Sequence, residues 1–226
     1  MPKDKILTNF QKEVLKEIGK SELSRFFVWS GGTALSFYYL QHRLSVDLDF
    51  MSQDLFREEY LLAELRKIAR KLGVKSIEEQ KKLNRHEFWL KKGEEVLRME
   101  FVFYPFPHIK PPQKLKEFNI KIDSIEDMLT NKAHAAYERS EPKDIFDLYC
   151  ILLIKKINFF RIFKWVEKKF GVKIDPVLFT GEALGGAEKL KEIRPSILKK
   201  KLFKPSSIKI YFQKEAGIYL KKKISR

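Results

Sequence analysis

The sequence predicts a protein of the α/β (α+β) class, in which a mixed sheet with flanking helices is followed by a C-terminal helical domain. Two observations predict this order. Short apolar runs typical of strands alternate with helical patterns as far as Tyr104. Prolines then cluster at 105–112, and beyond them every clear pattern is helical. We therefore expect two domains, at residues 1–110 and 111–226.

Helices are expected in the first half where apolar residues recur three or four positions apart. Such patterns cover 9–19 and 56–72, and each run ends at or next to a glycine that stops it. A shorter helix at 33–41 follows a break at Gly31-Gly32. Alternating or continuous apolar runs bounded by turn residues predict strands. These strands are expected at 26–29, 46–51, 86–90 and 96–104.

The second half predicts helices. Ser124 and Asp127 resemble a capping box that opens a helix to about residue 139, and Pro142 stands where the first turn of the next helix is expected. The segment 181–189 is rich in glycine but lacks the Gly-Lys-Ser/Thr end of a phosphate-binding loop. It is interpreted as a loop between helices. Further helices are expected at 158–170 and 206–223.

The charge is unevenly placed along the chain. The protein has 226 residues, with 46 Lys and Arg against 30 Asp and Glu, and residues 189–226 hold 13 basic but only 2 acidic side chains. Such a region favours a polyanionic partner, RNA above all, although a solubilising basic surface is the alternative. No run approaches the roughly 18 apolar residues of a membrane span. We therefore expect a cytoplasmic protein that does not bind membranes.

Two aspartates predict a metal site. Asp47 and Asp49 stand at alternate positions of the expected strand at 46–51, so both point to one face while Leu48 and Phe50 point to the other. Two carboxylates this close repel one another and are costly to desolvate. A divalent cation between them removes that cost. Hard oxygen ligands favour Mg²⁺, which also binds substrate phosphates, and Mn²⁺ is the alternative ion.

A glycine pair upstream predicts an anion site. Gly31 and Gly32 separate a strand from a helix, which lets the backbone approach a ligand closely. The helix that follows aims unpaired N–H groups and its positive dipole end at the same spot. Thr33 adds a hydroxyl and Arg43 a fork of donors. Together with the aspartates, this pattern predicts a site for an NTP–Mg²⁺ complex.

A third carboxylate completes the expected metal set. Glu100 is an acid in an otherwise apolar strand, with Met99 and Phe101 on the opposite face. Three carboxylates can hold two metal ions, which polarise a phosphate, activate an attacking oxygen and stabilise the leaving group.

These motifs carry a resemblance to a known family. Gly-Gly-Thr, then an Asp-hydrophobic-Asp strand, then a lone acid on a later strand resembles the nucleotidyltransferase superfamily with the DNA polymerase β fold. More closely, SGGTALSFYYLQHRLSVDLDF at 30–50 resembles the AbiEii/AbiGii toxin family, the nucleotidyltransferase toxins of type IV toxin–antitoxin systems. Lys132 in NKAHAAYER and Asp144 in KDIFDL resemble further motifs of that family. The similarity covers about 25–155.

The resemblance implies a role for each matching residue. Asp47 and Asp49 would be metal ligands and catalytic acids. Lys132 would contact the triphosphate or the transition state, and Asp144 would be a further active-site acid that positions Lys132 or the acceptor. This chain has Gly32-Thr33 where the superfamily often has Gly-Ser, and it has Glu100 where an Asp is common in the superfamily. The expected nucleotide-binding residues are Gly31, Gly32, Thr33, Arg43 and Ser45, with buttressing of the loop as the alternative for the last two.

The resemblance implies a nucleotidyltransferase-fold core and Mg²⁺-dependent transfer of a nucleoside monophosphate from an NTP with release of pyrophosphate. Together with the basic C-terminal region, it favours an RNA acceptor, the 3′ end of tRNA, and it implies a cognate antitoxin partner. Two alternatives stay open. One is transfer to a small molecule or a protein hydroxyl, and the other is a non-catalytic nucleic-acid-binding protein with a vestigial site.

Overall fold

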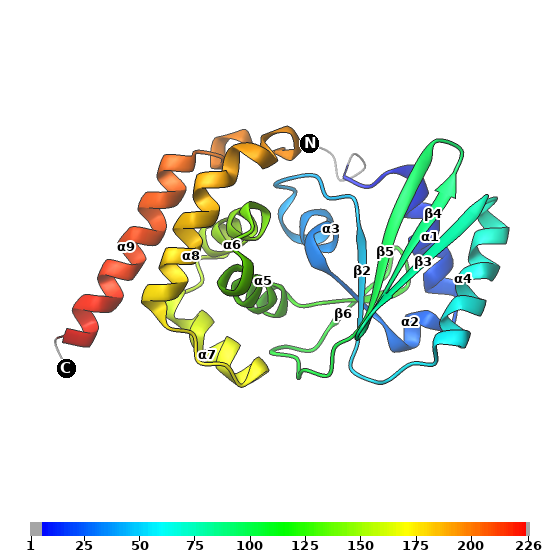
Figure 1. Cartoon of the computed structure of the whole chain (residues 1–226), viewed down its shortest axis with the longest axis horizontal. Coiled ribbons are helices and arrows are strands. Elements are labelled where there is room, and N and C mark those ends of the chain that lie inside the picture. Colours follow the sequence, from blue (N-terminus) through cyan, green and yellow to red (C-terminus); the bar gives the residue numbers. More distant parts are fainter. Residues whose placement is uncertain (1–5, 225–226) are drawn as a thin grey trace. The chain divides into compact units, whose positions relative to one another are not determined.

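The computed structural model describes residues 6–224, and the chain divides into two compact units, Met1–Ser124 and Ile125–Arg226 (Figure 1). The division falls further along the chain than the expected boundary at residue 110. The reason is a hairpin after the prolines, β6 (Gln113–Leu115) and β7 (Ile120–Ile122), whose second strand pairs with β1 (Val28–Ser30). Residues 225–226 of the basic segment lie outside the described part.

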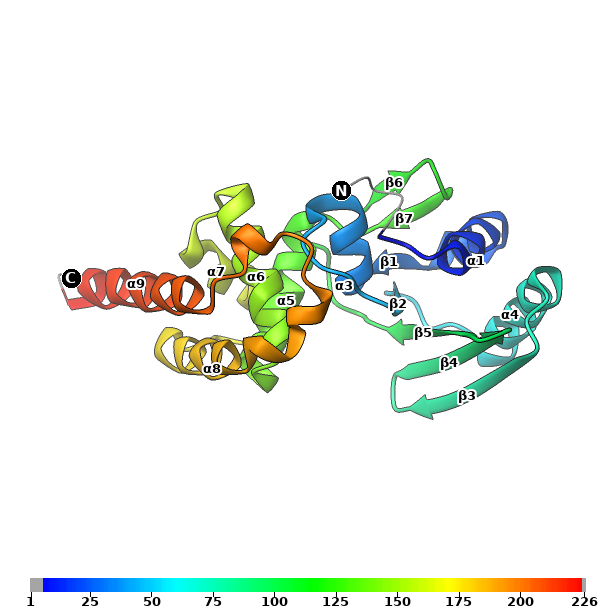
Figure 2. The ribbon, with the colours of Figure 1, turned by 90° about the horizontal axis from the view of Figure 1, so that it is seen from above.

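The first unit contains a seven-stranded mixed sheet with the strand order β3-β4-β5-β2-β1-β7-β6. β1 runs antiparallel to β2 and parallel to β7, while β2 runs parallel to β5. The long strands β3, β4 and β5 form an antiparallel meander that Figure 2 shows side by side. The expected mixed sheet is therefore confirmed. The remaining strands are β2 (Leu48–Ser52), β3 (Ser76–Lys82), β4 (Arg85–Lys92) and β5 (Glu95–Phe103).

One face of the central strands is the hydrophobic core of the first unit. Phe50 and Phe101 are buried on it, with stacked rings whose centroids are 5.1 Å apart. The helices α1 (Asn9–Lys20) and α4 (Glu58–Leu72) contact one another there and bury their apolar stripes. Because side chains alternate along each strand, a core on one face leaves the intervening residues on the other. The short helix α2 (Leu23–Phe26) leads into β1.

A helix begins at the end of β1, as expected. α3 (Gly31–Ala34) continues without a break into the π-helical segment η2 (Leu35–Leu40). Helical turns of this wider kind are rare and are frequent at functional sites. The helix ends at Gln41, which has a left-handed backbone with φ of 47°.

The second unit is helical. It contains α5 (Ile125–Arg139), α6 (Pro142–Lys155), α7 (Phe159–Phe170), α8 (Pro176–Glu188) and α9 (Pro205–Ile224), and the short 3-10 segments η3 (Lys189–Ser196) and η4 (Lys200–Leu202) lie between the last two. Figure 1 shows this succession from green to red. Cys150 is a buried thiol within α6. None of the helices in the described part combines the length and the apolar run needed to cross a bilayer.

The prediction of a loop at 181–189 is wrong, because the segment lies almost entirely inside α8. Tertiary packing explains the difference. A Cβ at Gly186 would stand 2.5 Å from Ile145 Cγ1 and 2.8 Å from the Ser140 carbonyl oxygen. The glycine therefore lets α8 pack closely against α6, which outweighs its low helix propensity.

Candidate active site

A row of polar side chains crosses the sheet of the first unit on the face opposite the core. In the strand register Ser30 stands opposite Asp49, Asp49 opposite Glu100, and Glu100 opposite Glu87. Residues paired directly across neighbouring strands point to the same side of a sheet. The row therefore joins β1, β2, β5 and β4. Asp49 is half-buried, while Glu100 and Glu87 are buried.

The glycine turn lies directly against this row. Gly31 has φ of +77°, and a Cβ built on it would stand 1.8 Å from Asp49 Oδ2. A Cβ on Gly32 would stand 2.6 Å from an Arg43 guanidinium nitrogen and 2.9 Å from Ser45 Oγ. Gly31 is thus sterically reserved for glycine, whereas a side chain at Gly32 would have to displace the ends of Arg43 and Ser45. The structure brings these five residues, which the sequence singled out, into one place.

The start of α3 keeps its backbone donors available. Ser30 is the N-cap residue, yet its side chain makes no capping hydrogen bond and instead donates to Asp123 Oδ2 at 2.7 Å. The Thr33 side chain is fully buried, and its hydroxyl has no hydrogen-bond partner within residues 6–224. Uncapped N–H groups at a helix start are the arrangement that binds phosphate.

Arg98 on β5 links the acids. Its guanidinium lies 3.2 Å from Asp47 Oδ2, 2.5 Å from Glu100 Oε1 and 3.3 Å from Glu87 Oε2. Partial burial acts to lower the pKa of Arg98, but Glu100, Asp47 and Glu87 together raise that pKa above its usual value. Arg98 is therefore firmly charged. Arg85 adds a second cation, 3.2 Å from Glu100 Oε2.

Glu87 was not predicted as a site residue. It is 2% exposed and contacts Lys82 at 3.6 Å as well as Arg98. An acid within the apolar strand sequence HEFWL is the same kind of signal that identified Glu100. The register of β4 on β5 then places Glu87 beside Glu100, which the sequence does not reveal.

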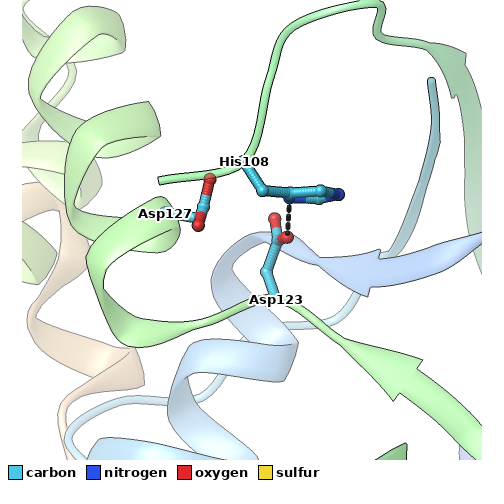
Figure 3. A group of neighbouring side chains, drawn as sticks. All are labelled: His108, Asp123 and Asp127. Atoms are coloured by element: carbon cyan, nitrogen blue, oxygen red, sulfur yellow. Dashed lines mark ion pairs between the residues drawn. The ribbon is translucent and has the colours of Figure 1, made fainter. Parts of the chain in front are cut away.

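A second pair of ligand-type side chains lies at the end of β7. His108 Nδ1 is 3.4 Å from Asp123 Oδ1, the ion pair drawn in Figure 3. Asp123 accepts the Ser30 hydroxyl on its other oxygen, so this pair buttresses the residue that precedes the glycine turn. Asp127, also labelled in Figure 3, belongs to the second unit, where Lys169 Nζ lies 2.6 Å from it.

The second unit holds the two residues expected from the helical motifs. Lys132 Nζ on α5 lies 2.7 Å from Asp144 Oδ1 and 2.9 Å from Asp147 Oδ2 on α6. Arg139 donates from Nε and Nη2 to Asp144 Oδ2 at 2.9 and 2.6 Å. Burial acts to raise the pKa of Asp144, but Lys132 and Arg139 outweigh it and hold that pKa below its usual value. Both aspartates are fully buried and fix the position of the ammonium group.

The carboxylates of the first unit are of the ligand type that suits a hard divalent cation, but among the described residues Asp47, Asp49 and Glu100 do not form a group of three converging donors. Asp47 and Asp49 are half-buried, so their carboxylates are accessible, and Glu100 is paired with Asp49 in the sheet register. Carboxylate oxygens are the ligands that Mg²⁺ and Mn²⁺ prefer, and no thiol or imidazole belongs to this set. The orphaned hydroxyl of Thr33 at the adjoining turn is consistent with a polar ligand there.

Comparisons with known proteins agree with the fold of the chain. A crystal structure of a candidate nucleotidyltransferase from Helicobacter pylori superposes with a TM-score of 0.58 at 17% identity, covering 93% of this chain and 92% of that one. The crystal structure of JHP933 from the same species gives 0.57 at 18% identity and covers 93% and 89%. An uncharacterised protein of Aquifex aeolicus strain VF5 is 28% identical over 167 residues, which are 71% of this chain and 74% of that protein.

The model of the AbiEii family, described as a nucleotidyl transferase toxin of type IV toxin–antitoxin systems, matches residues 13–206. This match over most of the chain makes the protein a nucleotidyltransferase. The chain belongs to that family. The fold class, the enzyme class and the family that the sequence indicated are thereby confirmed.

Proposed function

We propose that this protein transfers a nucleoside monophosphate from an NTP to RNA, at the 3′ end of tRNA, in a Mg²⁺-dependent reaction that releases pyrophosphate. The proposal depends on one observation above all. The glycine turn at the start of α3 touches Asp49, which is the sheet neighbour of Glu100. A phosphate-binding turn and a carboxylate set in direct contact are what an NTP with its metal ion requires.

The residues of the first unit divide the work. The N–H groups at Gly31 and Gly32 bind the triphosphate oxygens, and Arg43, held within reach of Gly32, adds charge to them. Asp47, Asp49 and Glu100 would hold the metal ion, which would supply charge neutralisation at the α-phosphate and at the leaving group. Ser45 supports the turn, because its hydroxyl lies next to Gly32. Phosphoryl-type transfer needs positioning and charge stabilisation more than covalent chemistry from the protein.

Lys132 supplies further positive charge for the triphosphate or the transition state. Asp144 and Asp147 keep its ammonium group in place, and Arg139 balances the second carboxylate charge. Asp144 is thus a positioning residue for Lys132 in this proposal. Removing Asp144 takes away one of the buried carboxylates that hold Lys132.

An RNA acceptor is favoured by the segment that joins α8 to α9. Its basic side chains are mostly exposed, and Glu192 is the one acid among residues 189–204. Such a segment contacts a phosphate backbone without sequence preference and in a salt-dependent way. Cytoplasmic action and a cognate antitoxin partner belong to the same proposal. The basic residues are Lys189, Lys191, Arg194, Lys199, Lys200, Lys201 and Lys204.

The test is a transfer assay across acceptor classes. The full chain is incubated with each α-³²P-labelled NTP and Mg²⁺, and separately with total tRNA, ribosomal RNA, protein extract or aminoglycosides. Label on tRNA that is lost when the 3′ end is blocked supports the proposal, and γ-³²P label must appear only in pyrophosphate. Label on protein or on a small molecule would show that the acceptor is not RNA. RNA binding without any transfer would indicate a vestigial site.

A further inference from the structure

Arg98 occupies an unexpected position for a site that has to bind a cation. Its guanidinium bridges Asp47 and Glu100, which are two of the three proposed metal ligands, at 3.2 and 2.5 Å. It lies on the same strand face as Glu100, two residues earlier in β5, and packs over the Trp89 ring with 5.9 Å to the centroid. Arg98 is therefore an integral part of the acidic row, with its guanidinium between the carboxylates.

Glu87 gives the same guanidinium another partner. It is nearly inaccessible and lies 3.3 Å from Arg98, yet it is not among the proposed metal ligands. Unpaired buried carboxylates are strongly destabilising. Arg98 satisfies Glu87 with Nη2, the nitrogen that also contacts Glu100, while Nη1 contacts Asp47.

We infer that Arg98 is a resident cation that holds Asp47 and Glu100 until a divalent metal ion takes their oxygens, and that Glu87 then retains Arg98. This inference rests on the proposed metal-binding role of Asp47, Asp49 and Glu100. Arg98 contacts Asp47 Oδ2 and Glu100 Oε1, so a metal ion that takes these oxygens has to displace the guanidinium. Two cations close together in a partly buried site also repel one another. Binding of the metal ion is thus coupled to the release of Asp47 and Glu100 from Arg98, which is a positioning residue.

The coupling predicts opposite effects from two neighbouring substitutions. Arg98→Gln removes the competitor, so Mn²⁺ binds more tightly by about threefold to tenfold, the range that one or two partly exposed ion pairs supply. Glu87→Gln removes the retaining partner, so Arg98 stays on Asp47 and Glu100 and Mn²⁺ binds more weakly by about threefold. Mere damage to the sheet would weaken metal binding in both variants.

The experiment measures free Mn²⁺ by electron paramagnetic resonance during titration of the full chain, with thermal melting to verify folding. Arg98→Lys is the second variant, because one ammonium group cannot bridge two carboxylates, and it should shift the Mn²⁺ dissociation constant in the direction of Arg98→Gln. Lys82→Gln is the control for charge alone, because Lys82 contacts Glu87 but neither metal ligand. It should leave the constant within about twofold of the wild type.

The outcomes separate this inference from the proposed function. Asp49-dependent Mn²⁺ binding that tightens in Arg98→Gln and weakens in Glu87→Gln supports the inference. Asp49-dependent binding that is unchanged by Arg98→Gln, or shifts equally in Lys82→Gln, overturns the inference and leaves the proposed function standing. Wild-type binding that is absent, or that survives Asp49→Asn unchanged, overturns both.

Discussion

Replacing Gly31 by alanine tests the geometry of the glycine turn. At φ of +77°, an alanine is held in the left-handed region, which costs about 1–2 kcal/mol of folding free energy. Its Cβ would also stand 1.8 Å from Asp49 Oδ2, and ordinary contact begins near 3.4 Å. The carboxylate oxygen therefore has to retreat by about 1.6 Å, the difference between 3.4 and 1.8 Å.

A displacement of this size is large for a catalytic group. Misplacing a reacting or metal-holding atom by about 1 Å costs on the order of 100-fold in rate. We therefore expect Gly31→Ala to lower the rate of NMP transfer by at least about 100-fold. The assay is the initial rate of α-³²P transfer, and urea unfolding followed by circular dichroism measures the change in stability.

Gly73→Ala is the matched control. Gly73 has nearly the same backbone conformation, with φ of +69°, but no described atom lies within 4 Å of the position that a Cβ would occupy there. It should lose a similar folding free energy of about 1–2 kcal/mol and keep its transfer rate. Equal rates in the two variants would refute the reasoning, since the backbone cost alone would then account for Gly31→Ala.

Three further predictions concern other parts of the molecule. Asp127→Asn removes the buried carboxylate that pairs with Lys169 and should cost about 3–5 kcal/mol of unfolding free energy in urea, whereas Lys67→Met, which removes an exposed lysine from its pair with Glu64, should cost less than about 1 kcal/mol. The folded pKa of Asp144 lies below the unfolded value near 3.9, so its ion pairs stabilise the fold above that pH and lose this effect as the pH falls through the folded pKa. The stability difference between the wild type and Asp144→Asn should therefore shrink below about pH 4. Changing the lysines at 199–201 to glutamine should flatten the logarithmic salt dependence of tRNA binding by about 2 to 3 units of slope.

Each of these predictions has a clear contrary result. Equal losses of unfolding free energy in Asp127→Asn and Lys67→Met would mean that burial does not determine the cost of breaking an ion pair in this protein. A stability difference for Asp144→Asn that does not change with pH would show that its ion pairs do not carry the pKa shift. An unchanged salt slope would remove the segment between α8 and α9 from the RNA contact surface.

Local pattern was sufficient to predict most of the helices and the place of the glycine turn between β1 and α3. Helical spacing predicts α1 and α4, because each helix buries one apolar stripe. Alternation along the strand expected at 46–51 predicts Asp47 and Asp49 on one face, because strands have a period of two. In the structure Asp49 lies in β2, whereas Asp47 directly precedes the strand. The residues that make up each of these patterns lie close together in the sequence, so the patterns can be recognised without knowledge of the fold.

Features that depend on distant partners could not be predicted in this way. β7 is recognised by its pairing with β1, about ninety residues earlier, and its three residues carry no pattern of their own. Glu87 becomes a site residue only through the register between β4 and β5. Gly186 lies in a helix because α8 has to approach Ile145 closely. In each case tertiary contact outweighs the local preference.

The central claim is that the carboxylate row beside the glycine turn performs the transfer. Its most direct test compares the single-turnover rate of NMP transfer from a labelled NTP to tRNA in the wild type, Asp49→Asn and Glu94→Gln, the last an exposed acid in the turn between β4 and β5. We predict a loss of at least about 1,000-fold for Asp49→Asn, as is typical when a principal electrostatic group of a site is removed, and no change for Glu94→Gln. Transfer by a folded Asp49→Asn variant at a rate close to that of Glu94→Gln would contradict the account.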